Sequence, residues 1–243
     1  MRVVNWNIER RGPTKWQAAS IAREIAGLEP DLVVLTEAHI DSLGSLGGHV
    51  LADRGYNAHR KADNERLILI WSPSPWEAIP LPQHLQENGG AVLGRTQISG
   101  RDVFCLGICI PWHMSPDVPV SDKITPWAQH VRFLSMLQPV LESATGLGPL
   151  IVAGDFNRFI PRMRGPKQPY ELLETVFSNT RIVTSGLLPP LNLRTIDHVA
   201  LSGPLSARSV SALSRFETDG RSRSDHFGVM VDLDWTPPSP QPD

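Results

Sequence analysis

Short apolar runs separated by polar turns recur along most of the chain, a pattern typical of a protein rich in β-strands. Runs of four to eight apolar or β-branched residues predict buried or half-buried strands. These runs are Val3–Trp6, Leu32–Leu35, Leu67–Trp71, Val103–Ile110, Leu150–Ala153, His198–Leu201 and Phe227–Leu233.

Two longer segments have helical spacing instead. Ile21, Ile25 and Leu28 predict an amphipathic helix over residues 16–28, with Thr14 as its N-terminal cap. The second helix is predicted over residues 127–142, where we expect Pro139 to kink the helix or end it early. Its core-facing residues are Val131, Leu134, Leu137 and Leu141.

Many strands and few helices favour stacked sheets with helices outside them over a regular βαβ repeat. A length of 243 residues suits one large domain, and 41% hydrophobic residues are enough to fill its core. We expect this domain to span residues 1–235. The tail, residues 236–243, has four prolines among its eight residues, which predicts a disordered end.

Charge and cysteine content limit the setting in which the protein acts. A net charge of −2 argues against tight, non-specific binding of duplex DNA, which usually needs a basic protein. Cys105 and Cys109 lie four residues apart in one predicted strand, too distant for a disulfide, so we expect a reducing, cytoplasmic location. No signal peptide is expected before the strand at Val3, no apolar stretch reaches the roughly 18 residues of a membrane span, and a monomer is the expected state.

Polar side chains recur where the predicted strands begin or end, and strand-end residues of a stacked-sheet protein can converge at one edge. The residues concerned are Asn7, Glu37, Asp155, Asn157, Asp197, Asp225 and His226. Oxygen donors without a cysteine–histidine cluster suit Mg²⁺ or Mn²⁺ better than zinc.

The motifs around these residues, taken in order, resemble those of the endonuclease/exonuclease/phosphatase (DNase I-like) family. The motifs are Asn5-Trp6-Asn7-Ile8, Leu35-Thr36-Glu37, Gly154-Asp155-Phe156-Asn157, Ile196-Asp197-His198-Val199 and Ser224-Asp225-His226-Phe227. The resemblance extends over nearly the whole chain. It implies a four-layer α/β/β/α sandwich of two mostly antiparallel sheets with outer helices, and hydrolysis of a phosphoester bond by water.

The resemblance also implies a magnesium site, in which Mn²⁺ can substitute. Glu37 corresponds to the principal metal ligand of the family, with Asn7 beside it, and Asp225 is expected as a further metal or hydrogen-bond contact. The metal would bind a phosphate oxygen and offset charge on the leaving group.

The remaining residues are expected to act on the water and the phosphate. By resemblance, Asp155 orients and deprotonates the attacking water, and Asn157 fixes that water or a phosphate oxygen. His226 donates to the phosphate or acts as the base, held in orientation by Asp197. Which of Asp155 and His226 takes the proton stays open from the sequence.

One position departs from the family pattern. Members usually carry tyrosine or histidine at the end of the strand that here ends near Ile110, and Cys109 occupies that position. His113, three residues after the strand, is an alternative substrate contact.

The substrate itself is not fixed by these motifs. A phosphodiesterase or nuclease is favoured, and the alternatives are an enzyme acting on a lipid or small-molecule phosphate and a catalytically silent binding module. A serine hydrolase using Ser224 is disfavoured because the chain has no Gly-x-Ser-x-Gly elbow. The loop with Arg158, Arg162, Arg164 and Lys167 is interpreted as solvated, with contact to a second phosphate as the alternative. Trp112 and Trp127 are interpreted as packed in the core, with stacking on a base or a lipid as the alternative.

Overall fold

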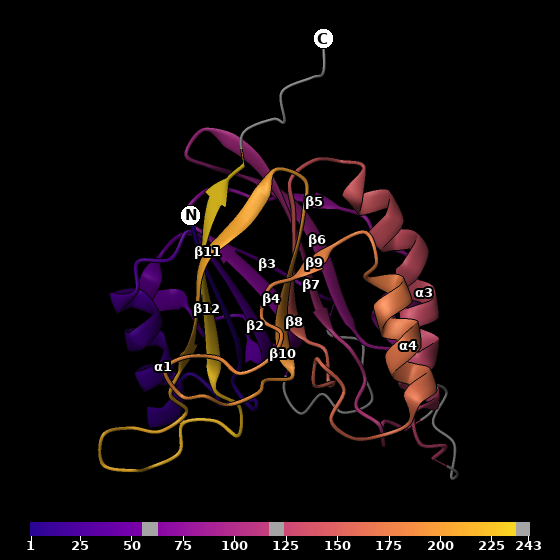
Figure 1. Cartoon of the computed structure of the whole chain (residues 1–243). Coiled ribbons are helices and arrows are strands. Elements are labelled where there is room, and N and C mark those ends of the chain that lie inside the picture. Colours follow the sequence, from indigo (N-terminus) through magenta and orange to yellow (C-terminus); the bar gives the residue numbers. More distant parts are fainter. Residues whose placement is uncertain (55–62, 117–123, 237–243) are drawn as a thin grey trace.

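The computed structural model describes residues 1–54, 63–116 and 124–236, and its centre is a pair of stacked six-stranded sheets (Figure 1). The first sheet has the order β11 (Leu205–Leu213), β12 (Gly228–Trp235), β1 (Arg2–Asn7), β2 (Leu32–His39), β4 (Glu65–Ser72) and β3 (His49–Ala52). The second has the order β5 (Glu77–Ile79), β6 (Gly90–Ile98), β7 (Arg101–Cys109), β8 (Leu150–Asp155), β10 (Asp197–Ser202) and β9 (Arg181–Ile182).

Both sheets are mostly antiparallel, as predicted. Strands β1 and β2 are parallel neighbours in the first sheet, and β7 and β8 are parallel neighbours in the second. The other described strand pairs are antiparallel. Because the parallel pairs lie in the middle of their sheets, the C-terminal ends of β1 and β2, and those of β7 and β8, lie next to each other midway along one edge of each sheet.

Helices cover the outer faces of the two sheets (Figure 1). Helix α1 (Trp16–Gly27) packs on the first sheet, and α3 (Ala128–Thr145) and α4 (Lys167–Val176) pack on the second. Two short elements, α2 (Gln83–Glu87) and the 3₁₀ helix Gly44–Leu46, complete the described helices. The resulting α/β/β/α order confirms the predicted four-layer sandwich.

The alternation of side chains along the strands separates three apolar layers. Val3 packs between the two sheets, whereas the next residue, Val4, packs beneath α1. In β8 the same alternation sends Ile151 between the sheets and Val152 toward α3 and α4. Each central strand is therefore buried on both faces, which explains its nearly continuous apolar sequence.

The structure corrects the predicted N-terminal cap of the first helix and shows that Pro139 does not end the second helix early. The N-terminal cap of α1 is Lys15, in extended backbone, with no side-chain cap hydrogen bond, so Thr14 does not cap the helix. Helix α3 continues past Pro139 to Thr145. Pro139 lies on the exposed face, where water can solvate the carbonyl that it frees, while Leu141 and Ala144 stay buried against the sheet.

Three other expectations can be compared with the structure. Cys105 and Cys109 are buried and unpaired, as expected. Within the described ranges, none of the helices has the length and hydropathy that a membrane crossing requires. Apart from Thr236, the tail predicted to be disordered lies outside the described residues.

Candidate active site

The strand pairing brings the predicted site residues to one edge of the sandwich. Asn7 ends β1 and pairs in register with Thr36, the residue before Glu37 in the parallel strand β2. In the second sheet, Asp155 ends β8 and is the cross-strand partner of Asp197, which begins the antiparallel strand β10. The two halves of the site therefore come from different sheets.

Asparagine side chains of β1 join these two halves. The amide of Asn7 donates to Asp155 Oδ2 at 3.2 Å. Two residues earlier, the fully buried Asn5 donates to the carbonyl oxygens of Gly154 (3.0 Å) and His198 (3.3 Å) in the second sheet. Asn5 was not predicted as a site residue, although its two-residue spacing from Asn7 places both side chains on one strand face.

Gly154 allows β8 to carry Asp155 into the site. Its φ is +148°, and a Cβ atom there would lie 1.7 Å from the carbonyl oxygen of Ile108 on β7. No other residue fits at that distance, so the glycine of the Gly-Asp-x-Asn motif is required by the close approach of two backbones.

Asn157 fixes the carboxylate of Asp155. Its backbone N–H donates to Asp155 Oδ1 at 2.7 Å, and its side-chain amide donates to Asp155 Oδ2 at 3.1 Å and to the carbonyl oxygen of Ile110 at 2.8 Å. Asn157 holds a left-handed backbone with φ 52°, a strained conformation that often marks functional positions. In this geometry its amide positions Asp155.

His226 and Asp197 form a close pair. His226 Nδ1 lies 2.6 Å from Asp197 Oδ2, and Asp197 is only 1% exposed. The other carboxylate oxygen, Oδ1, is buried and has no hydrogen-bond partner among the described residues. The loop before β12 is held by Trp6, whose Nε1 donates to the His226 carbonyl at 3.1 Å, and by Ser224, whose hydroxyl donates to the Asn7 carbonyl at 2.7 Å.

Burial and charge shift the titration of these groups in the same direction. Burial, followed by the neighbouring charge of Asp197, raises the pKa of Asp155. Burial alone lowers the pKa of His226, but the charge and hydrogen bond of Asp197 outweigh it and raise that pKa to about 10. The interaction with Asp197 therefore stabilises the protonated imidazole of His226.

Glu37 stands on the opposite wall of the site. It has a left-handed backbone, with φ 49°, and its carboxylate lies 3.4 Å from the guanidinium of Arg10. Arg10 in turn contacts Glu65 at 2.6 Å, so a single cation is shared by two carboxylates. Arg10 was not predicted as a site residue, because it follows β1 in a loop without a motif of its own.

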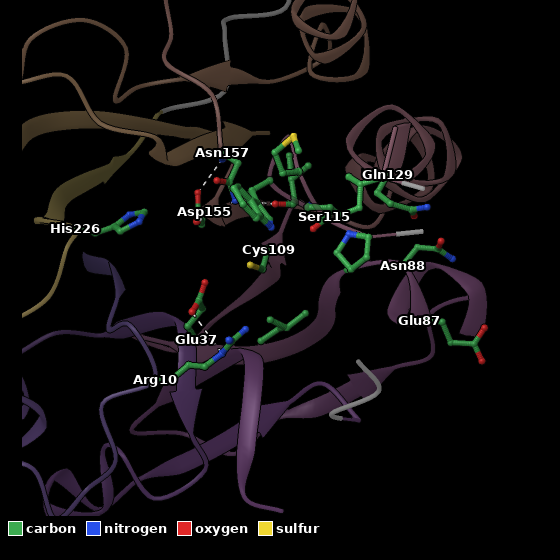
Figure 2. Close-up of a pocket in the computed structure, with 18 of the residues that line it drawn as sticks. Arg10, Glu37, Glu87, Asn88, Cys109, Ser115, Gln129, Asp155, Asn157 and His226 are labelled. Atoms are coloured by element: carbon green, nitrogen blue, oxygen red, sulfur yellow. Dashed lines mark hydrogen bonds and ion pairs between the residues drawn. The ribbon is translucent and has the colours of Figure 1, made fainter. Parts of the chain in front are cut away.

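A pocket of about 600 Å³ opens between these walls (Figure 2), and we call it the catalytic pocket. Glu37, Asp155, Asn157 and His226 lie around one end, with Cys109 at the base (Figure 2). The rest of its wall has an apolar part and a polar part. The apolar part is lined by Leu67, Ile110, Pro111, Trp112, Met114, Pro116 and Ile124, and the polar part by Glu87, Asn88, Ser115 and Gln129. The pocket can thus place a charged group at one end and an apolar group beside it.

Three further predicted residues occupy different places. Cys109 lines the catalytic pocket, but burial and then the charge of Asp155 raise its thiol pKa, so it stays neutral. Asp225 is also on the wall, with Oδ1 3.8 Å from His226 Nε2. His113 does not line this pocket; it faces a neighbouring cavity, where its ring lies 5.3 Å from that of Trp127.

Two interpretations need correction in part. Arg162, Arg164 and Lys167 are exposed, as interpreted, but Arg158 is not, and Trp112 is exposed and Trp127 only half-buried. Arg158 is buried against the ring of Trp127 at 4.4 Å and donates to the Pro166 carbonyl, because the aromatic ring and the carbonyl together replace water. Trp112 is 50% exposed, since it follows the end of β7 at the rim of the pocket.

The donor atoms fit a divalent cation. Asp155, Asp197 and His226 each offer a ligand atom, and these atoms lie within 4.8 Å of one another. Glu37 adds a carboxylate at the same end of the pocket. Asp197 has a buried oxygen without a described partner, and Glu37 shares the single guanidinium of Arg10 with Glu65. A hard cation would stabilise such an excess of carboxylate charge.

This geometry agrees with a match to a family model described as "Endonuclease/Exonuclease/phosphatase family", which covers residues 4–226. The chain belongs to this family. No curated protein sequence matches the chain.

Solved structures of family members have the same fold at low sequence identity. The protein from Bacteroides vulgatus superposes with a TM-score of 0.67 at 15% identity, covering 96% of this chain and 98% of that chain. D. rerio TDP2 complexed with a single-stranded DNA product gives 0.65 at 15% identity, covering 96% and 98%. The protein from Beutenbergia cavernae gives 0.64 at 20% identity, covering 97% and 72%.

Proposed function

We propose that this member of the phosphoester hydrolase family is a divalent-cation-dependent phosphodiesterase. The observation that carries the proposal is the convergence of Asp155, Asn157 and His226 at one end of a pocket, with Glu37 facing them and Asp197 bound to His226. Family membership over residues 4–226 supports the same reaction class.

Glu37 is the proposed principal ligand for Mg²⁺, and Asn7 and Asp225 are proposed as further ligands. The hydrogen bonds favour Glu37 over the Asp155–Asp197–His226 cluster, since Asp155 Oδ2 accepts from Asn7 and Asn157 and Asp197 Oδ2 faces His226. Mg²⁺ bound there would supply charge stabilisation for the phosphate oxygens and the leaving group.

The protein side chains would then orient the water and the phosphate. Asp155, held by three hydrogen bonds from Asn7 and Asn157, is the proposed base for the attacking water. His226 is hydrogen-bonded through Nδ1 to Asp197. Its Nε2 is then the atom that would donate to a phosphate oxygen or to the leaving group. This assignment requires no covalent enzyme intermediate.

The pocket favours a diester over a monoester. An ester with two organic groups can place its phosphate at the charged end and still have one group against the apolar wall of Trp112, Met114 and Ile124. The structural likeness to D. rerio TDP2, which was solved with single-stranded DNA product, is compatible with a nucleic-acid diester.

Hydrolysis of bis-p-nitrophenyl phosphate and p-nitrophenyl phosphate, with Mg²⁺, with Mn²⁺ and with EDTA, tests the proposal. We expect turnover of the diester that requires the cation and is lost in Asp155→Ala and His226→Ala. Turnover that persists in EDTA, or that survives both substitutions, would contradict it.

A further inference from the structure

A second cavity, of about 510 Å³, lies next to the catalytic pocket, and we call it the aromatic cavity. It is lined by Trp112, His113, Trp127, Asn157, Arg158, Phe159, Arg164, Gly165 and Ile196. Trp112 and Asn157 also line the catalytic pocket. A group attached to a phosphate near Asp155 can therefore reach the aromatic cavity directly.

Aromatic rings form one side of this cavity. The ring of His113 lies 5.2 Å from that of Trp112, edge to face, and 5.3 Å from that of Trp127, at an angle of 32°. Trp112 is half exposed, so one end of this series is open to a ligand. Rings presented in this way offer faces and edges on which another planar ring can stack.

The aromatic cavity is held in place before any ligand binds. The backbone N–H of Trp127 donates to the backbone carbonyl of His113 at 2.7 Å, and Trp127 has a left-handed backbone with φ 71°. Arg158 packs over Trp127 and donates to the Pro166 carbonyl at 2.9 Å. A Cβ atom at Gly165 would meet the Arg158 guanidinium at 2.6 Å, so the loop is tightly fitted. A fixed surface of this kind binds with less loss of conformational entropy.

The charge of the aromatic cavity is opposite to that of the catalytic pocket. None of its described lining residues is Asp or Glu, whereas Arg158 and Arg164 both contribute. Arg164 is exposed, and its guanidinium lies 5.4 Å from the ring centroid of Phe159. Aromatic rings next to an exposed guanidinium suit a ligand that has both a planar ring and a phosphate.

We infer that the aromatic cavity binds a nucleobase of a single-stranded nucleic acid, next to the phosphate that is cleaved. The position of that phosphate rests on the proposed hydrolase function. A base inside a duplex is stacked on both faces and cannot enter, so the cavity selects single strands or frayed ends. Because every base has a flat face, the rings alone give little preference among bases.

Two chromogenic diesters with the same leaving group test this inference. Thymidine 5′-(p-nitrophenyl phosphate) carries a base, and methyl p-nitrophenyl phosphate does not. We expect the ratio of kcat/KM for the thymidine diester to kcat/KM for the methyl diester to fall about tenfold in Trp112→Ala and in Arg164→Ala. The matched control is Met163→Ala, which removes a 59% exposed side chain from the same loop outside the cavity lining and should keep the ratio.

Binding without catalysis separates this inference from the proposed function. Anisotropy of a short fluorescein-labelled oligothymidylate, measured in EDTA, should show binding that weakens in Trp112→Ala and Arg164→Ala and not in Met163→Ala. That result supports the cavity even if no diester is hydrolysed, in which case only the proposed function fails.

Two results would overturn the inference. One is hydrolysis of both diesters by the wild type with a ratio that the variants do not change, which would leave the proposed function intact. The other is stronger competition by a short-chain phosphatidic acid than by unlabelled oligothymidylate, which would assign the cavity to an acyl chain.

Discussion

His226 Nδ1 and Asp197 Oδ2 lie 2.6 Å apart, although the two residues belong to different sheets. Asp197 begins β10 in the second sheet, and His226 precedes β12 in the first. The pair can form only when the two sheets are stacked in the observed register. The orientation of the imidazole is therefore a property of the assembled sandwich and not of either local segment.

A double-mutant cycle should show that Asp197 acts through His226. We expect Asp197→Asn and His226→Ala each to lower kcat on bis-p-nitrophenyl phosphate by about 10²–10⁴-fold, because the imidazole is lost or misoriented. Asp197→Asn added to His226→Ala should lower kcat little further, since residues that act as a unit are not additive. Multiplicative losses in the double variant would show that Asp197 acts separately from His226.

Glu37 is predicted to dominate binding of the divalent cation. Calorimetry with Mn²⁺ should show at least about tenfold weaker binding in Glu37→Gln, because a carboxylate ligand is replaced by a neutral amide. Glu87→Gln provides the matched control, since Glu87 lines the same pocket away from the Asp155 end (Figure 2). Equal affinity in wild type and Glu37→Gln would move the cation to the Asp155–Asp197–His226 cluster.

Sequence patterns predicted the central strands well because these are buried on both faces and have uniform apolar runs. Strands β6 and β11 were not predicted, because polar residues or glycine interrupt the apolar residues of each strand. β6 begins with glycine and has polar residues near its end, and β11 alternates serine and arginine with apolar residues at the edge of its sheet. Neither strand contains a continuous apolar run of the kind that predicted the others.

The candidate site was predictable to the extent that strand ends define it. Asn7, Glu37 and Asp155 lie at or near the C-terminal ends of central strands, so their convergence could be expected from the topology. The position of Arg10 between two glutamates and the aromatic cavity around Trp127 depend on how loops pack, which no local motif records.

Arg223 is predicted to anchor the loop that carries His226. It is 5% exposed; its guanidinium pairs with Glu24 of α1, donates to the Ser214 carbonyl and lies 5.2 Å from the ring centroid of Trp6. Arg223→Ala should reduce the free energy of unfolding by about 2 kcal/mol, measured by urea denaturation, because partly buried acceptors lose a charged donor. It should also lower kcat, because the loop before β12 loosens.

Arg221 is the matched control for this prediction. It lies two residues away on the same loop and is exposed, and it pairs with Asp219 at 2.7 Å. Its guanidinium also lies 4.3 Å from the ring centroid of Trp16. Exposed contacts of both kinds contribute little, so Arg221→Ala should change the unfolding free energy by less than about 1 kcal/mol. Similar losses in both variants would mean that burial of Arg223 does not anchor the loop.

His130 should make the fold sensitive to acid. Its ring is fully buried beneath the loop after β7, where Nδ1 donates to the Pro111 carbonyl at 2.9 Å, and burial lowers its pKa to about 4. An unfolded histidine has a pKa of about 6.5, so the unfolded chain takes up a proton that the folded protein rejects. Stability should therefore fall as the pH drops from about 6.5 to 4, by about 2 kcal/mol at pH 5 from this residue.

His130→Asn isolates this contribution, because asparagine keeps a side-chain N–H for the Pro111 carbonyl but does not titrate. Other buried groups, including His198, whose pKa burial also lowers, remain in both proteins and cancel in the comparison. Urea denaturation at pH 7.5 and pH 5 should show that the variant loses about 2 kcal/mol less than wild type over this interval. An equal loss in the two proteins would mean that His130 takes up its proton in the folded state as readily as in the unfolded chain.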